Sequence, residues 1–123
     1  DLVMSGMWAN LMAPNESHGA HTHSNNLLSG VYYLQSDGYT GITFHDPRPA
    51  AAVLQPTFTD YNDYNASSMT YPSKANRAII FPSWLSHLVN MNMSDKFRLS
   101  ISWNIYLRGQ LSEPSSLETA TYG

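Results

Sequence analysis

The strictest alternation of apolar and polar side chains in this chain is the stretch FRLSISWNIYL, residues 97–107. Successive side chains of a β-strand point to opposite faces, so a period of two predicts one strand with an apolar and a polar face. The polar face carries Arg98, Ser100, Ser102, Asn104 and Tyr106. It either lies in water or lines the inside of a barrel, and in the second case a preceding segment or a partner subunit would cover the apolar face.

Five further strands are expected outward from this one, at residues 4–11, 28–34, 40–44, 77–81 and 87–89. They are short and are separated by Gly, Pro, Asn and Ser. No segment of the chain shows a sustained helical period. Such a pattern favours an all-β sandwich or barrel. Residues 46–74 lack periodicity and are expected to form a loop or lid over a site, and residues 110–123 a flexible tail.

The length of 123 residues fits a single domain spanning residues 1–123. We expect it to be a fragment that lacks N-terminal elements, because it starts at Asp1 and enters a strand almost at once. A formal charge of −3 provides no basic surface, so nucleic acid is not an expected partner. No apolar run approaches the roughly 18 to 20 residues of a membrane span and no signal segment opens the chain, so we expect a cytoplasmic protein.

Cysteine is absent, so any metal must be bound by nitrogen and oxygen atoms. The segment HGAHTHSNN places His21 and His23 two residues apart, and on an extended backbone their Cα atoms lie about 6 to 7 Å apart on one face. That spacing can chelate one ion, although a histidine-containing polar loop fits the same letters. His18 is interpreted as a bystander.

A third histidine follows a strand and a proline turn in IIFPSWLSHLV, at His87. Alone, such a histidine is more often a structural one that is hydrogen-bonded to the backbone. Arg98 follows eleven residues later, and Ser100 shares its strand face. A guanidinium and a hydroxyl placed in this way can hold a carboxylate through charge-assisted hydrogen bonds.

Taken together and in this order, HTHSNNLLSGVYYL, GITFHDPR, AIIFPSWLSHLV and FRLSISWNI resemble the double-stranded β-helix core of the 2-oxoglutarate/Fe(II)-dependent oxygenases. The resemblance covers roughly residues 8–105 and is nearest to an uncharacterised subgroup with HxH, SGVYYL and DPR segments. The prolyl-hydroxylase-like branch is more distant. The resemblance implies an all-β jelly-roll, cupin-like barrel that uses Fe(II) and 2-oxoglutarate.

Residue by residue, the resemblance implies that His21 is the first metal ligand and His87 the distal one. His23 stands where the family usually has a carboxylate, which implies either a three-histidine site or a carboxylate from elsewhere, such as Asp46. We favour three histidines, because Asp46 follows the GITF strand in a turn and matches no ligand position of the family pattern. Arg98 and Ser100 match the residues that hold the far carboxylate of 2-oxoglutarate. Tyr33 matches a tyrosine that also reaches it, or is a core aromatic residue.

The activity implied is hydroxylation of an unknown small-molecule or peptide substrate, with decarboxylation of 2-oxoglutarate to succinate. Two alternatives remain open: a cupin-like metal protein that does not use 2-oxoglutarate, and a non-catalytic jelly-roll binding or structural domain. For Asn104 we expect a structural hydrogen bond, and for Asp46 and Arg48 a pair that fixes a turn. The apolar face of residues 97–107 favours a homodimer.

Overall fold

The structure, a computed structural model, describes residues 1–48 and 53–123, which contain ten strands and no helix. The all-β expectation is therefore confirmed. The strands are β1 (Leu2–Met12), β2 (His18–His21), β3 (Leu28–Gln35), β4 (Asp37–His45), β5 (Ser68–Lys74), β6 (Ala78–Pro82), β7 (His87–Val89), β8 (Arg98–Leu107), β9 (Gly109–Leu111) and β10 (Ala120–Tyr122). Within these residues nothing qualifies as a membrane-spanning helix.

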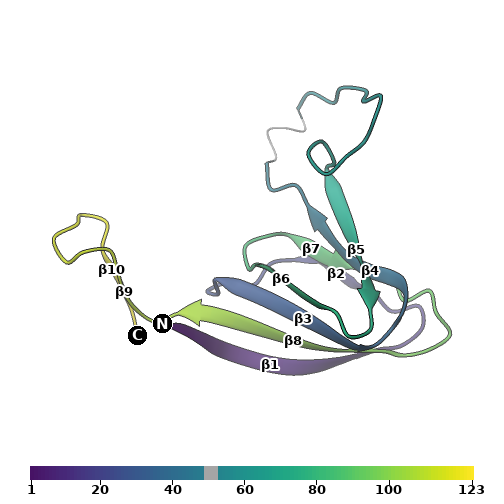
Figure 1. Cartoon of the computed structure of the whole chain (residues 1–123), viewed down its shortest axis with the longest axis horizontal. Helices are drawn as coiled ribbons and strands as arrows, with labels where there is room; N and C mark the ends of the chain where they lie inside the picture. The colour runs from purple at the N-terminus through teal and green to yellow at the C-terminus, as the bar shows by residue number, and fades with distance from the viewer. Residues whose placement is uncertain (49–52) are drawn as a thin grey trace.

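The first eight strands form two antiparallel four-stranded sheets, in the orders β1-β8-β3-β6 and β2-β7-β4-β5 (Figure 1). The chain crosses between the sheets repeatedly, so strands far apart in sequence become neighbours. Strand β8 lies between β1 and β3 and pairs with both. This is the expected jelly-roll, or double-stranded β-helix, arrangement.

Strand β8 turns its polar face toward the space between the sheets. Arg98 is only 4% exposed and Ser100 6%, and Ser100 lies opposite Tyr33 of β3, which is 2% exposed. The orientation in which the polar face lines a barrel is therefore correct, and the one that puts it in water is wrong. On the other face, Trp103 packs against Gly30, where an added Cβ would overlap the indole ring.

The outer face of the β1-β8-β3-β6 sheet exposes several large apolar side chains. They include Met7 on β1, which lies opposite Trp103 of β8, and Ile80 on β6, which lies opposite Gly30 of β3. Exposed apolar faces of this kind are typical of interaction surfaces. The homodimer expected from this face stays a prediction.

The apolar core is small and lies on the β4 and β6 side of the interior. Ile42, Phe44 and Phe81 are buried, with Ile79 and Leu85 packed against them. The rest of the interior mixes apolar side chains, such as Val31 and Tyr33, with polar ones that include the buried Arg98. A jelly roll whose interior is partly polar has room for a polar ligand rather than for more core.

Four strands were not predicted: β2, β5, and the short β9 and β10 near the C-terminus. Strand β2 is four residues long and mostly polar, and β5 lies in the segment 46–74 that we expected to be a loop. Pro72 obscured β5, yet a proline is tolerated there because β5 is an edge strand. The connection before β5 remains irregular, and residues 49–52 of it lie outside the described residues. Within residues 110–123, β10 pairs with β9 in a hairpin (Figure 1), and the flexibility of this tail stays a prediction.

Candidate metal centre and anion site

Three histidines converge where β2 and β7 pair. His21 ends β2 and lies in register with His87 at the start of β7. His23 follows two residues later, and its backbone N–H donates to the Ser83 carbonyl at 2.9 Å. One ring nitrogen from each of the three histidines lies within 4.8 Å of the others. The structure thus brings together the three residues that the HxH motif and His87 suggested.

Hydrogen bonds orient two of these rings. His21 Nδ1 lies 2.8 Å from the Gly19 carbonyl, and His87 Nδ1 lies 2.9 Å from the Leu85 carbonyl. A carbonyl oxygen can only accept, so each Nδ1 carries the proton and each Nε2 keeps its lone pair. Backbone carbonyls support metal-binding histidines in this way in many proteins.

The protonation states also suit metal binding. Burial is the main cause that lowers the pKa of His87 to about 4; the Leu85 carbonyl opposes the change and the neighbouring histidines contribute to it. Burial, followed by the charges of His21 and His18, lowers the pKa of His23. These two imidazoles are therefore neutral at pH 7 and need not lose a proton to bind an ion. Three neutral imidazoles fit a divalent transition metal such as Fe(II) or Zn(II).

Arg98 is the second feature of the site. Its Nη1 donates to Thr40 Oγ1 at 3.1 Å and its Nη2 to the Met12 sulfur at 2.8 Å, and its Cζ lies 6.0 Å from the centre of the Tyr33 ring. Burial lowers its pKa. Among the described residues, the single ion pair is the one between Asp46 and Arg48, so no carboxylate pairs with Arg98. A buried guanidinium with only a hydroxyl and a thioether as partners can accept an anionic ligand.

The three histidines and Arg98 line one cavity of about 120 Å³ between the sheets. Tyr33 and Ser100 line it too, as do Ser102 and Asn10, whose side-chain amide donates to Ser102 Oγ at 2.9 Å. Sequence reasoning missed Asn10 and the Thr40 partner of Arg98. Asn10 could have been found, because it lies within the first predicted strand between Trp8 and Met12 and shares their face. Nothing in the sequence marks Thr40.

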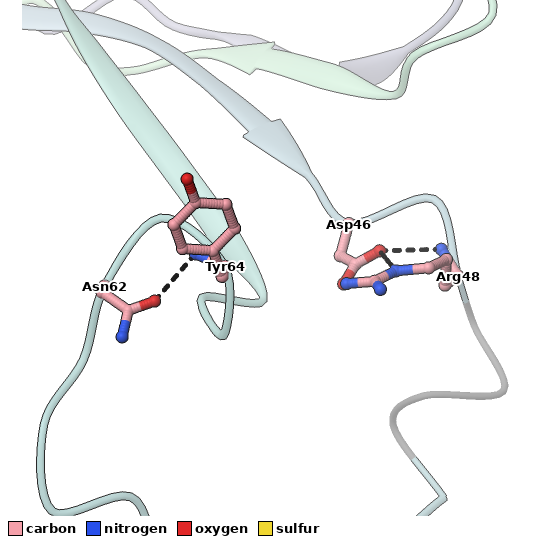
Figure 2. Close-up of polar contacts among 4 residues, drawn as sticks. All are labelled: Asp46, Arg48, Asn62 and Tyr64. Carbon is pink, nitrogen blue, oxygen red and sulfur yellow. Dashed lines mark hydrogen bonds and ion pairs between the residues drawn. The ribbon is translucent and has the colours of Figure 1, made fainter.

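Asp46 does not join the histidines. It lies just past the end of β4, and Arg48 folds back onto it with Nε and Nη2 donating to the two carboxylate oxygens at 2.9 and 2.7 Å (Figure 2). These bonds lower the pKa of Asp46 to about 2. The turn-fixing interpretation is confirmed. A similar local bond, from the Tyr64 amide to Asn62 Oδ1, shapes the facing loop (Figure 2).

Asn104 and His18 have supporting positions. Asn104 Oδ1 accepts from Ser29 Oγ at 2.7 Å, which confirms the structural hydrogen bond expected for it. Ser29 Oγ also lies 2.8 Å from Ser83 Oγ, so this buried network reaches the residue whose carbonyl holds His23. The His18 ring stacks on His21 with centroids 4.4 Å apart, but His18 is not among the three clustered nitrogens.

Comparison with known proteins agrees with this geometry. Residues 6–104 match the family described as "Putative 2OG-Fe(II) oxygenase". The chain belongs to this family. Membership in the 2OG-Fe(II) oxygenase family implies Fe(II) and 2-oxoglutarate as metal and cosubstrate, and it confirms the resemblance found in the sequence. None of the curated proteins matches the chain.

Solved structures share the fold at low sequence identity. An oxidoreductase of the 2OG-Fe(II) oxygenase family from Burkholderia pseudomallei superposes with a TM-score of 0.66 at 13% identity, over 86% of this chain and 45% of its own. SnoN, a non-heme alpha ketoglutarate dependent epimerase from nogalamycin biosynthesis, gives 0.64 at 15% identity, over 94% and 52%. A cupin domain from Bordetella pertussis Tohama I gives 0.51 at 16% identity, over 87% and 93%. The chain thus spans about half the length of the Burkholderia pseudomallei protein and of SnoN.

Proposed function

We propose that this chain forms the catalytic core of an Fe(II)- and 2-oxoglutarate-dependent oxygenase that hydroxylates its substrate. His21, His23 and His87 hold the metal, and Arg98 holds the far carboxylate of 2-oxoglutarate. The observation that carries the proposal is the sharing of one cavity by three clustered histidines and a buried arginine that has no carboxylate partner among the described residues. Family membership supplies the identity of the metal and the cosubstrate.

When bound, Fe(II) and 2-oxoglutarate supply the oxidation: one atom of O₂ enters a substrate C–H bond, and the other oxidises 2-oxoglutarate to succinate and carbon dioxide. The protein's own contribution is positional. The Gly19 and Leu85 carbonyls fix two imidazoles with Nε2 available, and Ser83 fixes the backbone of His23. Phe44 and Phe81 pack beside His87, with ring centroids 5.9 and 4.7 Å away, and give that side of the imidazole an apolar surrounding.

Charge balance favours a dianionic cosubstrate. Three neutral imidazoles leave both positive charges of a divalent ion uncompensated, and the buried Arg98 adds a third. A dicarboxylate offsets two of these three charges in a setting where unpaired charge is costly. Ser100 and Tyr33 line the same cavity as Arg98, so their hydroxyls can donate to the same carboxylate.

The all-histidine donor set also supports a second candidate, a cupin-like protein that binds a metal without 2-oxoglutarate. A neutral ligand set binds several divalent ions, and the fold matches a cupin domain. In that case Arg98 has no cosubstrate to bind, and its replacement leaves metal-dependent behaviour intact.

The test is anaerobic addition of Fe(II) and 2-oxoglutarate, monitored by the visible charge-transfer band of the metal-bound keto acid. We expect a band in the wild type and in Arg108→Ala, which removes an exposed arginine from the end of β8. In Arg98→Ala the concentration of 2-oxoglutarate needed for half the band should rise about 10- to 150-fold, the value of a lost charged hydrogen bond. Metal binding without a band would favour the cupin-like candidate.

A further inference from the structure

The cavity that holds the histidines and Arg98 is too small for a cosubstrate and a substrate together. Its volume is about 120 Å³, whereas pockets for small molecules usually measure roughly 300 to 1,000 Å³. A five-carbon dicarboxylate bound between the metal and Arg98 takes up most of it. The substrate therefore needs an adjoining space.

An adjoining space exists between the edge strands of the two sheets. A cleft of about 570 Å³ lies between β4 and β5 on one side and β6 on the other, and Phe81 lines both this cleft and the cavity. The Phe81 ring packs against the His87 ring, with their centroids 4.7 Å apart. Leu85, whose carbonyl accepts from His87, also lines the cleft. Phe81 and Leu85 thus lie between the cleft and His87, a proposed metal ligand.

The lining of the cleft indicates what it can bind. Its walls are apolar and include Met69 and Tyr71 on the exposed edge strand β5. Charged groups occur only at the rim, where Asp46 and Arg48 pair with each other and Asp63 adds a further carboxylate. The rim therefore carries a net negative charge, which repels an anion and attracts a cation.

We propose that this cleft is the substrate subsite, and that it takes an aromatic or aliphatic body whose head group is neutral or cationic rather than anionic. The inference rests on the proposed function, because a substrate subsite presupposes the oxygenase reaction. The apolar body lies between β5 and β6, with its reactive end at Phe81, where the cleft meets the cavity, and the head group lies toward Asp63. Burial of the body against the walls supplies most of the affinity.

The test uses two probes with the same apolar body, 4-phenylbutylamine and 4-phenylbutyrate, titrated into the ¹⁵N-labelled chain. We expect the amine to shift the amide resonances of Met69, Tyr71 and Phe81 and to bind more tightly than the carboxylate. Met69→Trp fills the cleft and should weaken binding of the amine at least about tenfold. Met91→Trp is the matched control, since Met91 is exposed and lies outside the cleft, and it should leave binding unchanged. The spectra themselves report whether each variant is folded.

Shifts confined to other regions, or equal binding to Met69→Trp, would overturn the cleft as the subsite, and tighter binding of the carboxylate would overturn its charge preference. The same amine added to the anaerobic Fe(II) and 2-oxoglutarate complex should perturb the charge-transfer band in the wild type and not in Met69→Trp. A band without cleft binding overturns this inference alone. Cleft binding without any band overturns the proposed function, and the substrate role with it.

Discussion

Arg98 is expected to lower the stability of the ligand-free protein while making cosubstrate binding possible. It is 4% exposed, its partners are Thr40 Oγ1 and the Met12 sulfur, and burial lowers its pKa. Keeping a charge in such a place costs free energy, and replacing buried charges by apolar side chains of similar volume is often stabilising by about 1 to 4 kcal/mol. Arg98→Met should therefore stabilise the ligand-free chain by about 1 to 3 kcal/mol.

The same substitution should remove the stabilisation that the cosubstrate gives. A ligand at 100 times its dissociation constant stabilises the folded state by about 2.7 kcal/mol. With metal present, 2-oxoglutarate should raise the free energy of unfolding of the wild type by about this amount and that of Arg98→Met much less. The difference in free energy of unfolding between Arg98→Met and the wild type should thus narrow or change sign when ligand is added.

The assay is urea unfolding of the wild type, Arg98→Met and Arg108→Met, each with and without a redox-inert divalent ion and 2-oxoglutarate. Arg108 is exposed, so its replacement should change the free energy of unfolding by less than about 0.5 kcal/mol. Destabilisation of the ligand-free chain by Arg98→Met, with Arg108→Met neutral, would show that the guanidinium is already satisfied within the protein. The argument for an anion site would then fail.

Three other predictions follow from the geometry. The pKa of His87 is about 4 in the folded chain against about 6.5 unfolded, so below pH 6.5 the unfolded chain binds more protons. Through this group, the free energy of unfolding of the metal-free protein should fall by at most about 3 kcal/mol between pH 6.5 and 4. The fall should be smaller by that contribution in His87→Gln, which keeps the contribution of His23. Gly41→Ala would drive a Cβ into the Tyr71 carbonyl oxygen, whereas a Cβ at Gly6 meets no other atom within 4 Å. Thermal unfolding should show that Gly41→Ala lowers the free energy of unfolding by about 1 to 3 kcal/mol and that Gly6→Ala changes it little. Asp46→Asn should leave metal stoichiometry and affinity unchanged by equilibrium dialysis, and a lower metal content would return Asp46 to the ligand set.

The alternating strand and the order of the motifs allowed much of the fold to be predicted. Residues 97–107 gave the central strand because its period of two is strict, whereas β5 was missed because Pro72 and polar residues hide an edge strand. The sequence of β8 alone does not determine whether its polar face points into the barrel or toward solvent. The direction depends on whether a second sheet covers that face, which is a tertiary fact.

The candidate site was predictable where identity and spacing are chemical signals. His21 and His23 are two residues apart, and His87 and Arg98 follow in the order of a known family. Thr40 was not predictable, because a threonine in a strand carries no sign of its partner. The adjoining cleft was not predictable either, since its walls come from β4, β5 and β6 and meet only in the folded chain.

If the histidines and Arg98 form one site for a metal and 2-oxoglutarate, the two ligands must bind cooperatively. Calorimetry under anaerobic conditions, with and without Fe(II), gives the dissociation constant of 2-oxoglutarate in each case. We expect Fe(II) to tighten binding at least about tenfold, a coupling of about 1.4 kcal/mol or more, because ion and arginine hold opposite ends of one molecule. Affinity that is independent of the metal, or no binding at all, would contradict the single site.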